Sequence, residues 1–147
     1  MSDKAIKYTN DSLAYQFNKN FRVFGSDESA TILMRGLYVR DQDMIYVYRN
    51  GYYTLLDDQM LEDMVYNFIT QMKNDADKPM KYNQNITVGM IRDIQWQIKR
   101  QVMNRISTLR GNYITFNDGH VLDLSTFILL PASPEHHSIF YLDAPST

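Results

Sequence analysis

The chain has 147 residues, 44% of them hydrophobic and 22% charged, which is the composition of one ordinary globular domain. Its formal net charge of -2 excludes a uniformly basic DNA-binding protein, and the absence of cysteine excludes disulfides, zinc-thiolate sites and cysteine nucleophiles. No apolar run is long enough to span a membrane, so we expect a cytoplasmic protein with no membrane partner.

The first quarter of the sequence predicts a helix followed by a less regular segment. Leu13, Phe17 and Phe21 recur every four positions, which is typical of the buried side of a helix, here over residues 12 to 24. A polar, turn-prone stretch follows. The apolar run over residues 31 to 40 then predicts a strand or an irregular sheet edge.

The clearest local pattern in the sequence is a β-hairpin. Two β-prone runs, residues 44 to 49 and 52 to 56, are joined by Asn50-Gly51. Both central residues of a type I′ turn need a positive φ, which asparagine and glycine tolerate. We therefore expect two antiparallel strands with a two-residue turn.

Two further helices and a long surface loop are predicted next. Acidic residues precede an apolar stripe that predicts a helix over residues 58 to 73. Residues 74 to 86 are polar and are expected to form a loop. Isoleucines at helical spacing then predict the longest helix, from residue 87 to about residue 108, with Gly111 as its stop.

The remaining residues predict a small β meander. Strands are expected over residues 113 to 116, 121 to 124, 127 to 130 and 139 to 142. Helices and strands are segregated along the chain and do not alternate, so we expect an α+β fold and not a doubly wound sheet, and parallel crossovers are not required. The prediction is one domain over residues 12 to 143, an antiparallel hairpin and meander packed with about three helices, between a flexible N-terminus (1 to 11) and a short tail (144 to 147).

Motifs that carry chemistry are mostly absent. The sequence has no Walker A loop, no G-x-G-x-x-G and no H-E-x-x-H, so we expect no catalysis, no cofactor and no metal in this chain alone. His136, His137, Asp123 and Asp143 could in principle bind a metal, but the simpler interpretation is surface histidines after a turn. A triad of Ser125, His136 and Asp123 lacks the strained elbow that activates a serine.

The charge distribution is more informative than any motif. Residues 57 to 78 carry six acids and two lysines, whereas residues 87 to 110 carry five cations and one acid. On the long helix, a stripe suited to phosphate contact and base stacking follows helical spacing and comprises Arg92, Trp96, Lys99 and Met103. The alternative is that Trp96 packs internally and the cations are solvated or pair with the acidic helix. The DNA-contact candidates are Arg92, Trp96, Lys99, Arg100, Arg105 and Arg110.

Three short motifs near the C-terminus carry a family resemblance. They are Phe116-Asn117-Asp118-Gly119-His120, Leu122-Asp123-Leu124-Ser125-Thr126 and Leu130-Pro131-Ala132-Ser133-Pro134-Glu135. With the early helix, the hairpin and the paired helices in the same order, the sequence resembles the domain that precedes the superfamily-three helicase in phage, plasmid and poxvirus primase-helicases. The resemblance spans about residues 12 to 143. His120 is an extra residue in the turn, and Asp118 and Ala132 stand where asparagine and histidine are usual in the family.

The resemblance implies a non-catalytic domain between primase and helicase modules. Such a domain would promote ring assembly as a collar and guide DNA, in the cytoplasm of a virus- or phage-infected cell. The implied partners are a superfamily-three helicase module in cis or in trans, single-stranded or forked DNA, and further copies of the chain. The chain would be either a piece of a larger ATP-dependent primase-helicase or a free-standing relative.

A competing hypothesis is a free-standing viral interaction protein that binds a host or replisome protein. The sequence contains 11 tyrosines, and tyrosine suits contact surfaces because its ring packs while its hydroxyl stays hydrated. An exposed edge of the predicted hairpin would be the contact surface. The protein-contact candidates are Tyr46, Tyr48, Tyr52 and Tyr53.

Overall fold

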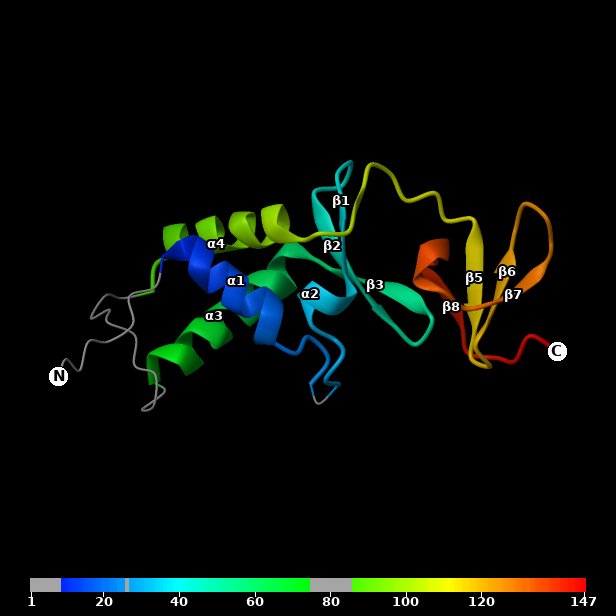
Figure 1. The fold of residues 1–147 in the computed structure, drawn as a ribbon, viewed down its shortest axis with the longest axis horizontal. Helices are drawn as coiled ribbons and strands as arrows, with labels where there is room; N and C mark the ends of the chain where they lie inside the picture. The colour runs from blue at the N-terminus through cyan, green and yellow to red at the C-terminus, as the bar shows by residue number, and fades with distance from the viewer. Residues whose placement is uncertain (1–8, 26, 75–85) are drawn as a thin grey trace. The chain divides into compact units, whose positions relative to one another are not determined.

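The computed structural model describes residues 9–25, 27–74 and 86–147, and within them the α+β class is confirmed. The described residues form four α-helices, one short 3-10 helix and eight strands in two small sheets (Figure 1). The chain divides into two compact units: unit 1 is Met1–Met34 with Asp57–Val102, and unit 2 is Arg35–Leu56 with Met103–Thr147. The expectation of a single domain over residues 12 to 143 stays a prediction, because this division does not test whether the units fold independently.

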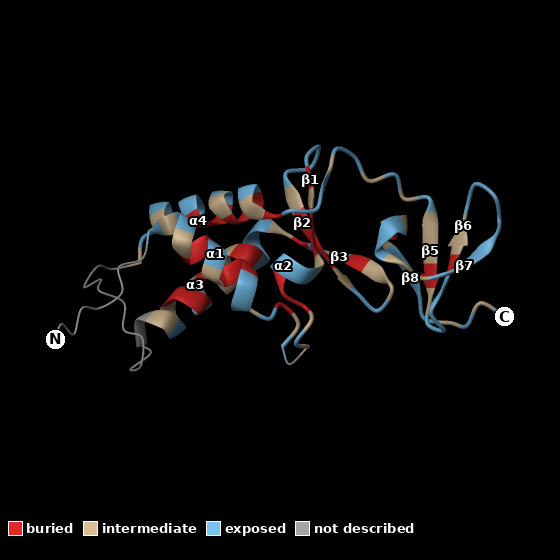
Figure 2. Ribbon diagram, viewed as in Figure 1, coloured by how far each residue is buried: buried red, intermediate tan, exposed pale blue. Residues whose placement is uncertain are grey.

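Unit 1 is built from three longer helices, α1 (Asn10–Asn20), α3 (Asp58–Asn74) and α4 (Val88–Gln101), and α4 packs against both of the others. All three helices contain buried residues, which are red in Figure 2. The ring of Phe17 meets the ring of Phe68 edge-on at 5.5 Å, which joins α1 to α3. The apolar stripes in the sequence therefore form the core of unit 1.

Side chains at the helix starts explain where the helices begin. Thr9 accepts a hydrogen bond from the N–H of Ser12, whose side chain in turn accepts from the N–H of Thr9, so α1 starts two residues before the predicted boundary. The carboxylate of Asp57 accepts from the N–H of Met60 at 2.8 Å and starts α3 where the sequence predicts it. The hydroxyl of Thr87 does the same for α4.

Several predicted boundaries are wrong: the first helix, for example, ends at Asn20 and not at residue 24. The run over residues 31 to 40 forms one helical turn, α2 (Ile32–Arg35), and then strand β1 (Gly36–Val39). The helix predicted to reach residue 108 ends at Gln101, because Val102 has an extended backbone and β4 (Arg105–Ile106) pairs with β1. Most of the predicted loop over residues 74 to 86 lies outside the described residues.

The first sheet of unit 2 contains the predicted hairpin. Strand β2 (Met44–Arg49) pairs antiparallel with β3 (Tyr52–Leu56), and Asn50 and Gly51 have φ angles of 60° and 90°. The strand order is β3-β2-β1-β4, and β1 and β4 are parallel. The hairpin is confirmed, and the parallel β1–β4 pair is an addition that the sequence pattern did not require.

The second sheet of unit 2 corresponds to the predicted meander. Its strands are β5 (Tyr113–Phe116), β6 (His120–Asp123), β7 (Leu129–Pro131) and β8 (Phe140–Leu142), in the order β7-β6-β5-β8. Strand β8 lies parallel to β5, which the sequence analysis did not predict. The hydroxyl of Thr115 donates to the carbonyl of Gly51 at 2.9 Å and connects the two sheets. No helix among the described residues is long and apolar enough to cross a membrane.

Candidate nucleic-acid interface

The exposed side of α4 carries two arginines and the only tryptophan of the chain. Ile91, Ile94 and Ile98 are buried and orient α4 toward the core, which turns residues 92, 96 and 100 outward at successive steps of four. Trp96 is 52% exposed, and the guanidinium of Arg100 lies 4.4 Å from the centre of its ring system. We call Arg92, Trp96 and Arg100 the α4 face.

Lys99 does not belong to this face. It is only 8% exposed, and its ammonium lies 2.7 Å from the carboxylate of Asp58 at the start of α3. The amide of Gln95 donates to the backbone carbonyl of the same aspartate at 3.0 Å. The prediction that Lys99 shares an exposed stripe with Arg92 and Trp96 is therefore wrong, because position 99 faces α3. This contact agrees with the alternative that a cation pairs with the acidic helix.

The other two predicted cations, Arg105 and Arg110, belong to unit 2. Both are exposed, and the guanidinium of Arg105 lies 4.4 Å from the ring centre of Tyr38. The hydroxyl of Tyr38 donates to Asp43 at 2.7 Å, and this hydrogen bond raises the pKa of Tyr38. Arg110 lines a hollow of about 260 Å³ beside His136. The α4 face in unit 1 therefore rests on three of the six predicted residues.

Two of the four hairpin tyrosines proposed as an exposed contact surface are buried, and the other two are half-buried. Tyr46 and Tyr53 are 8% and 5% exposed, and the hydroxyl of Tyr46 donates to Gln42. The ring of Tyr48 lies 5.1 Å from that of Tyr53, and burial raises the pKa of both phenols. Tyr52 stacks on the ring of Tyr141 of β8. Their aromatic surface is used mainly for packing within unit 2.

The polar sets that were considered for metal binding or nucleophilic catalysis are not assembled into sites. Among the described residues, no three His, Asp or Glu side chains are grouped to hold a metal ion. The hydroxyl of Ser125 donates to Asp123 at 2.6 Å within one turn. His136 stacks on the ring of Tyr113 at 4.9 Å, and burial lowers the pKa of His137. These groups stabilise turns of the second sheet.

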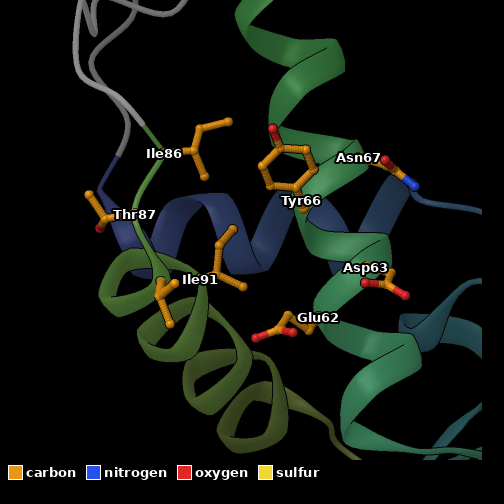
Figure 3. A pocket seen from close by; sticks show the side chains of 8 residues that line it. Glu62, Asp63, Tyr66, Asn67, Ile86, Thr87 and Ile91 are labelled. Atoms are coloured by element: carbon orange, nitrogen blue, oxygen red, sulfur yellow. The ribbon is translucent and has the colours of Figure 1, made fainter.

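An acidic groove of about 460 Å³ lies between α3 and the start of α4 (Figure 3). Glu62 and Asp63 lie on its α3 side, and Tyr66 and Ile86 approach each other across it in Figure 3. Carboxylates repel phosphate, so this groove is unsuited to nucleic acid. Unit 1 thus carries an acidic groove along α3 and a basic, aromatic face on α4, in agreement with the charge pattern of the sequence.

One exposed apolar feature was missed by the sequence analysis. Residues 127 to 130 were predicted as a strand, but β7 starts only at Leu129, and Phe127 lies in the preceding turn. Phe127 is 77% exposed. The Ser-Thr pair before it is the signal that could have indicated a turn.

Comparisons with known proteins add no functional assignment to this geometry. No family model and no curated protein sequence matches the chain.

Proposed function

We propose that the chain is a non-catalytic accessory module of a DNA-replication primase-helicase, and that its α4 face guides single-stranded DNA. The module acts together with a superfamily-three helicase module, in cis or in trans. The observation that carries the DNA contact is the exposed Trp96 between two exposed arginines on one helix.

Each part of the α4 face has a separate physical role in this proposal. Arg92 and Arg100 contact phosphates, and each contact releases counterions from the strand. The indole of Trp96 has half of its surface exposed, so a base can stack on it. Stacking of this kind is worth about 1–3 kcal/mol per base and tolerates any sequence. The expected binding is therefore salt-dependent and not sequence-specific.

The link to a helicase is supported by the C-terminal motifs, whose residues hold the turns of the second sheet. Gly119 has a φ of 83°, as the turn before β6 requires. The carboxylate of Asp123 accepts from the N–H of Ser125 at 2.9 Å. The hydroxyl of Ser133 accepts from the N–H of Glu135 at the start of the 3-10 helix. The residues that resemble the family therefore have structural roles, as expected of a collar without catalytic residues.

The DNA contact is tested by fluorescence anisotropy of a labelled oligothymidylate at two salt concentrations. Trp96→Ala is expected to weaken binding about tenfold through lost stacking. Arg92→Ala and Arg100→Ala are each expected to weaken it and to reduce the salt slope by about 1. Arg40→Ala removes an exposed arginine of unit 2 and is the matched control. Equal affinity of wild type and all α4-face variants would contradict the proposed DNA contact.

The helicase link needs a separate experiment, because DNA binding alone does not identify a collar. The chain is joined to, or mixed with, a superfamily-three ATPase module, and the fraction of assembled rings is measured by mass photometry. We expect a larger ring fraction in the presence of the chain. An unchanged ring fraction would contradict the collar role and leave the DNA contact standing.

A further inference from the structure

The turn between β6 and β7 exposes four large apolar side chains in six residues. Their exposed fractions are 37% for Leu124, 77% for Phe127, 55% for Ile128 and 43% for Leu129. We call these four residues the turn patch. In Figure 2 the loop between β6 and β7 is pale blue, whereas the red segments of this sheet, which mark buried residues, lie on the strands. An exposed apolar cluster of this kind is typical of a contact surface.

The backbone of Phe127 is held in an unfavourable conformation. Its φ is 58°, in the left-handed region that suits glycine and costs other residues about 1 kcal/mol or more. The N–H of Phe127 donates to the carbonyl of Asp123 at 2.7 Å, and the N–H of Asp123 donates to the carbonyl of Ile128 at 3.0 Å. These bonds hold the turn in place. Glycine would satisfy the same backbone without strain, so stability of the chain does not explain an exposed phenylalanine here.

The electrostatics of the C-terminal region limit what can cover the turn patch. Residues 111 to 147 contain four acids and no lysine or arginine. Asp123 lies next to the patch and is charged at neutral pH, as aspartates ordinarily are, and hydrogen bonds from Ser125 lower its pKa further. A partner surface with exposed apolar area and positive charge is therefore favoured. The α4 face has both properties, since it combines the exposed Trp96 with two arginines.

We propose that the turn patch docks on the α4 face of a second copy of this chain. Phe127 packs against the exposed indole of the second copy, and Asp123 faces its arginines. The two surfaces differ, so the contact is heterologous and joins copies into a closed ring or an open chain. This inference goes beyond the proposed DNA contact and does not require it. If both hold, single-stranded DNA and a second copy compete for the α4 face.

The association is measured by sedimentation velocity of the full chain over a wide range of concentrations, without DNA. We expect the average mass to rise with concentration at low salt and to fall toward the monomer at about 1 M salt, where charges are screened within about 3 Å. A monomer at every concentration in low salt would overturn the proposal.

Phe127→Gly separates docking from folding. Glycine accepts the positive φ, so we expect equal or higher thermal stability together with at least tenfold weaker self-association. Phe127→Asn, which also tolerates this conformation, is the second variant. Met34→Ala is the matched control, because Met34 is 62% exposed in unit 1 and outside the turn patch. Wild-type association of both Phe127 variants would overturn the proposal.

The two proposals fail in distinguishable ways. Anisotropy at low protein concentration, where self-association is negligible, reports the DNA contact alone. Association that depends on Phe127 in a chain that binds no DNA would support the inference and contradict the proposed DNA contact. DNA binding that depends on Trp96 in a chain that stays monomeric would support the proposed DNA contact and contradict the inferred self-association.

Discussion

Unit 1 and the second sheet of unit 2 differ in how many of their apolar side chains are buried. In unit 1 the apolar stripes of three helices are buried against one another, while Trp96 is exposed on the α4 face. In the second sheet, only Val121 among the apolar side chains is buried, while the turn patch and all of β8 are exposed. Burial in unit 1 is thus explained by folding, whereas the turn patch is exposed and available for the docking proposed above.

The largest expected effect comes from the core of unit 1. Ile98→Ala removes a side chain that is fully buried on α4 and should lower the free energy of unfolding by about 3 kcal/mol, through lost burial and a cavity. Leu129→Ala in the turn patch should lower it by less than about 1 kcal/mol, because that side chain is 43% exposed. Urea denaturation measures both. Equal losses would show that the turn patch is also part of a core.

A second variant tests how tightly the two sheets of unit 2 pack. A Cβ at Gly51 would lie 2.9 Å from the side chain of Thr115 and 3.2 Å from that of Ala132, at a φ of 90°. Gly51→Ala should therefore lower the free energy of unfolding by about 2 kcal/mol. Gly119→Ala is the control. Gly119 also has a positive φ, of 83°, but a Cβ added there would meet no atom within 4 Å outside its chain neighbours. Gly119→Ala should lower the free energy of unfolding by about 1 kcal/mol, from backbone strain alone. A loss at position 51 no larger than at position 119 would argue against close packing there.

The ion pair between Lys99 and Asp58 in unit 1 is expected to give a smaller effect. Asp58→Asn removes the carboxylate next to Lys99 and should lower the free energy of unfolding by about 1.5 kcal/mol, because the Lys99 side chain is 10% exposed but that of Asp58 is 56% exposed. Lys99→Met keeps the packing and removes the buried charge, so its effect should stay within about 1 kcal/mol. Thermal melts of both variants compare them. A larger loss for Lys99→Met than for Asp58→Asn would contradict this interpretation of the pair.

The smallest expected effect is a change with pH in the stability that Asp118 contributes to the second sheet. Hydrogen bonds from the hydroxyl and N–H of Ser146 lower the pKa of Asp118 to about 2. Because the folded-state pKa lies below the unfolded value, the stabilisation is present above about pH 4 and is lost as the pH falls through about 2. Wild type should therefore melt above Asp118→Asn at neutral pH, and the two should converge near pH 2. A gap that persists in acid would rule out this linkage.

Much of the local structure could be predicted from the sequence, because the signals are local. Asn50-Gly51 fixes the hairpin through its positive φ angles, and Asp57 starts α3 through its side chain. The charge difference between α3 and α4 also follows directly from residue counts. Helical spacing correctly placed Arg92 and Trp96 of the predicted stripe on one exposed side of α4, whereas Arg100 was a DNA-contact candidate but not a member of that stripe.

The predictions that failed depend on contacts between distant residues. Helix α4 ends at Gln101 although apolar spacing continues, because Arg105 pairs with Tyr38 of β1, far away in the sequence. Lys99 is buried because Asp58 lies opposite it on α3. The strain at Phe127 arises from the β6–β7 connection. Local patterns cannot predict such contacts, because they depend on which elements pack together.

The most direct test of the DNA contact uses Trp96, because it is the only tryptophan of the chain and its fluorescence reports on the α4 face alone. Oligothymidylate is added at low and at high salt, and the emission is recorded for wild type and for Arg92→Ala. The proposal predicts quenching that saturates with DNA, weakens at high salt and shifts to higher DNA concentrations in the variant. DNA binding by anisotropy with unchanged Trp96 emission would contradict it.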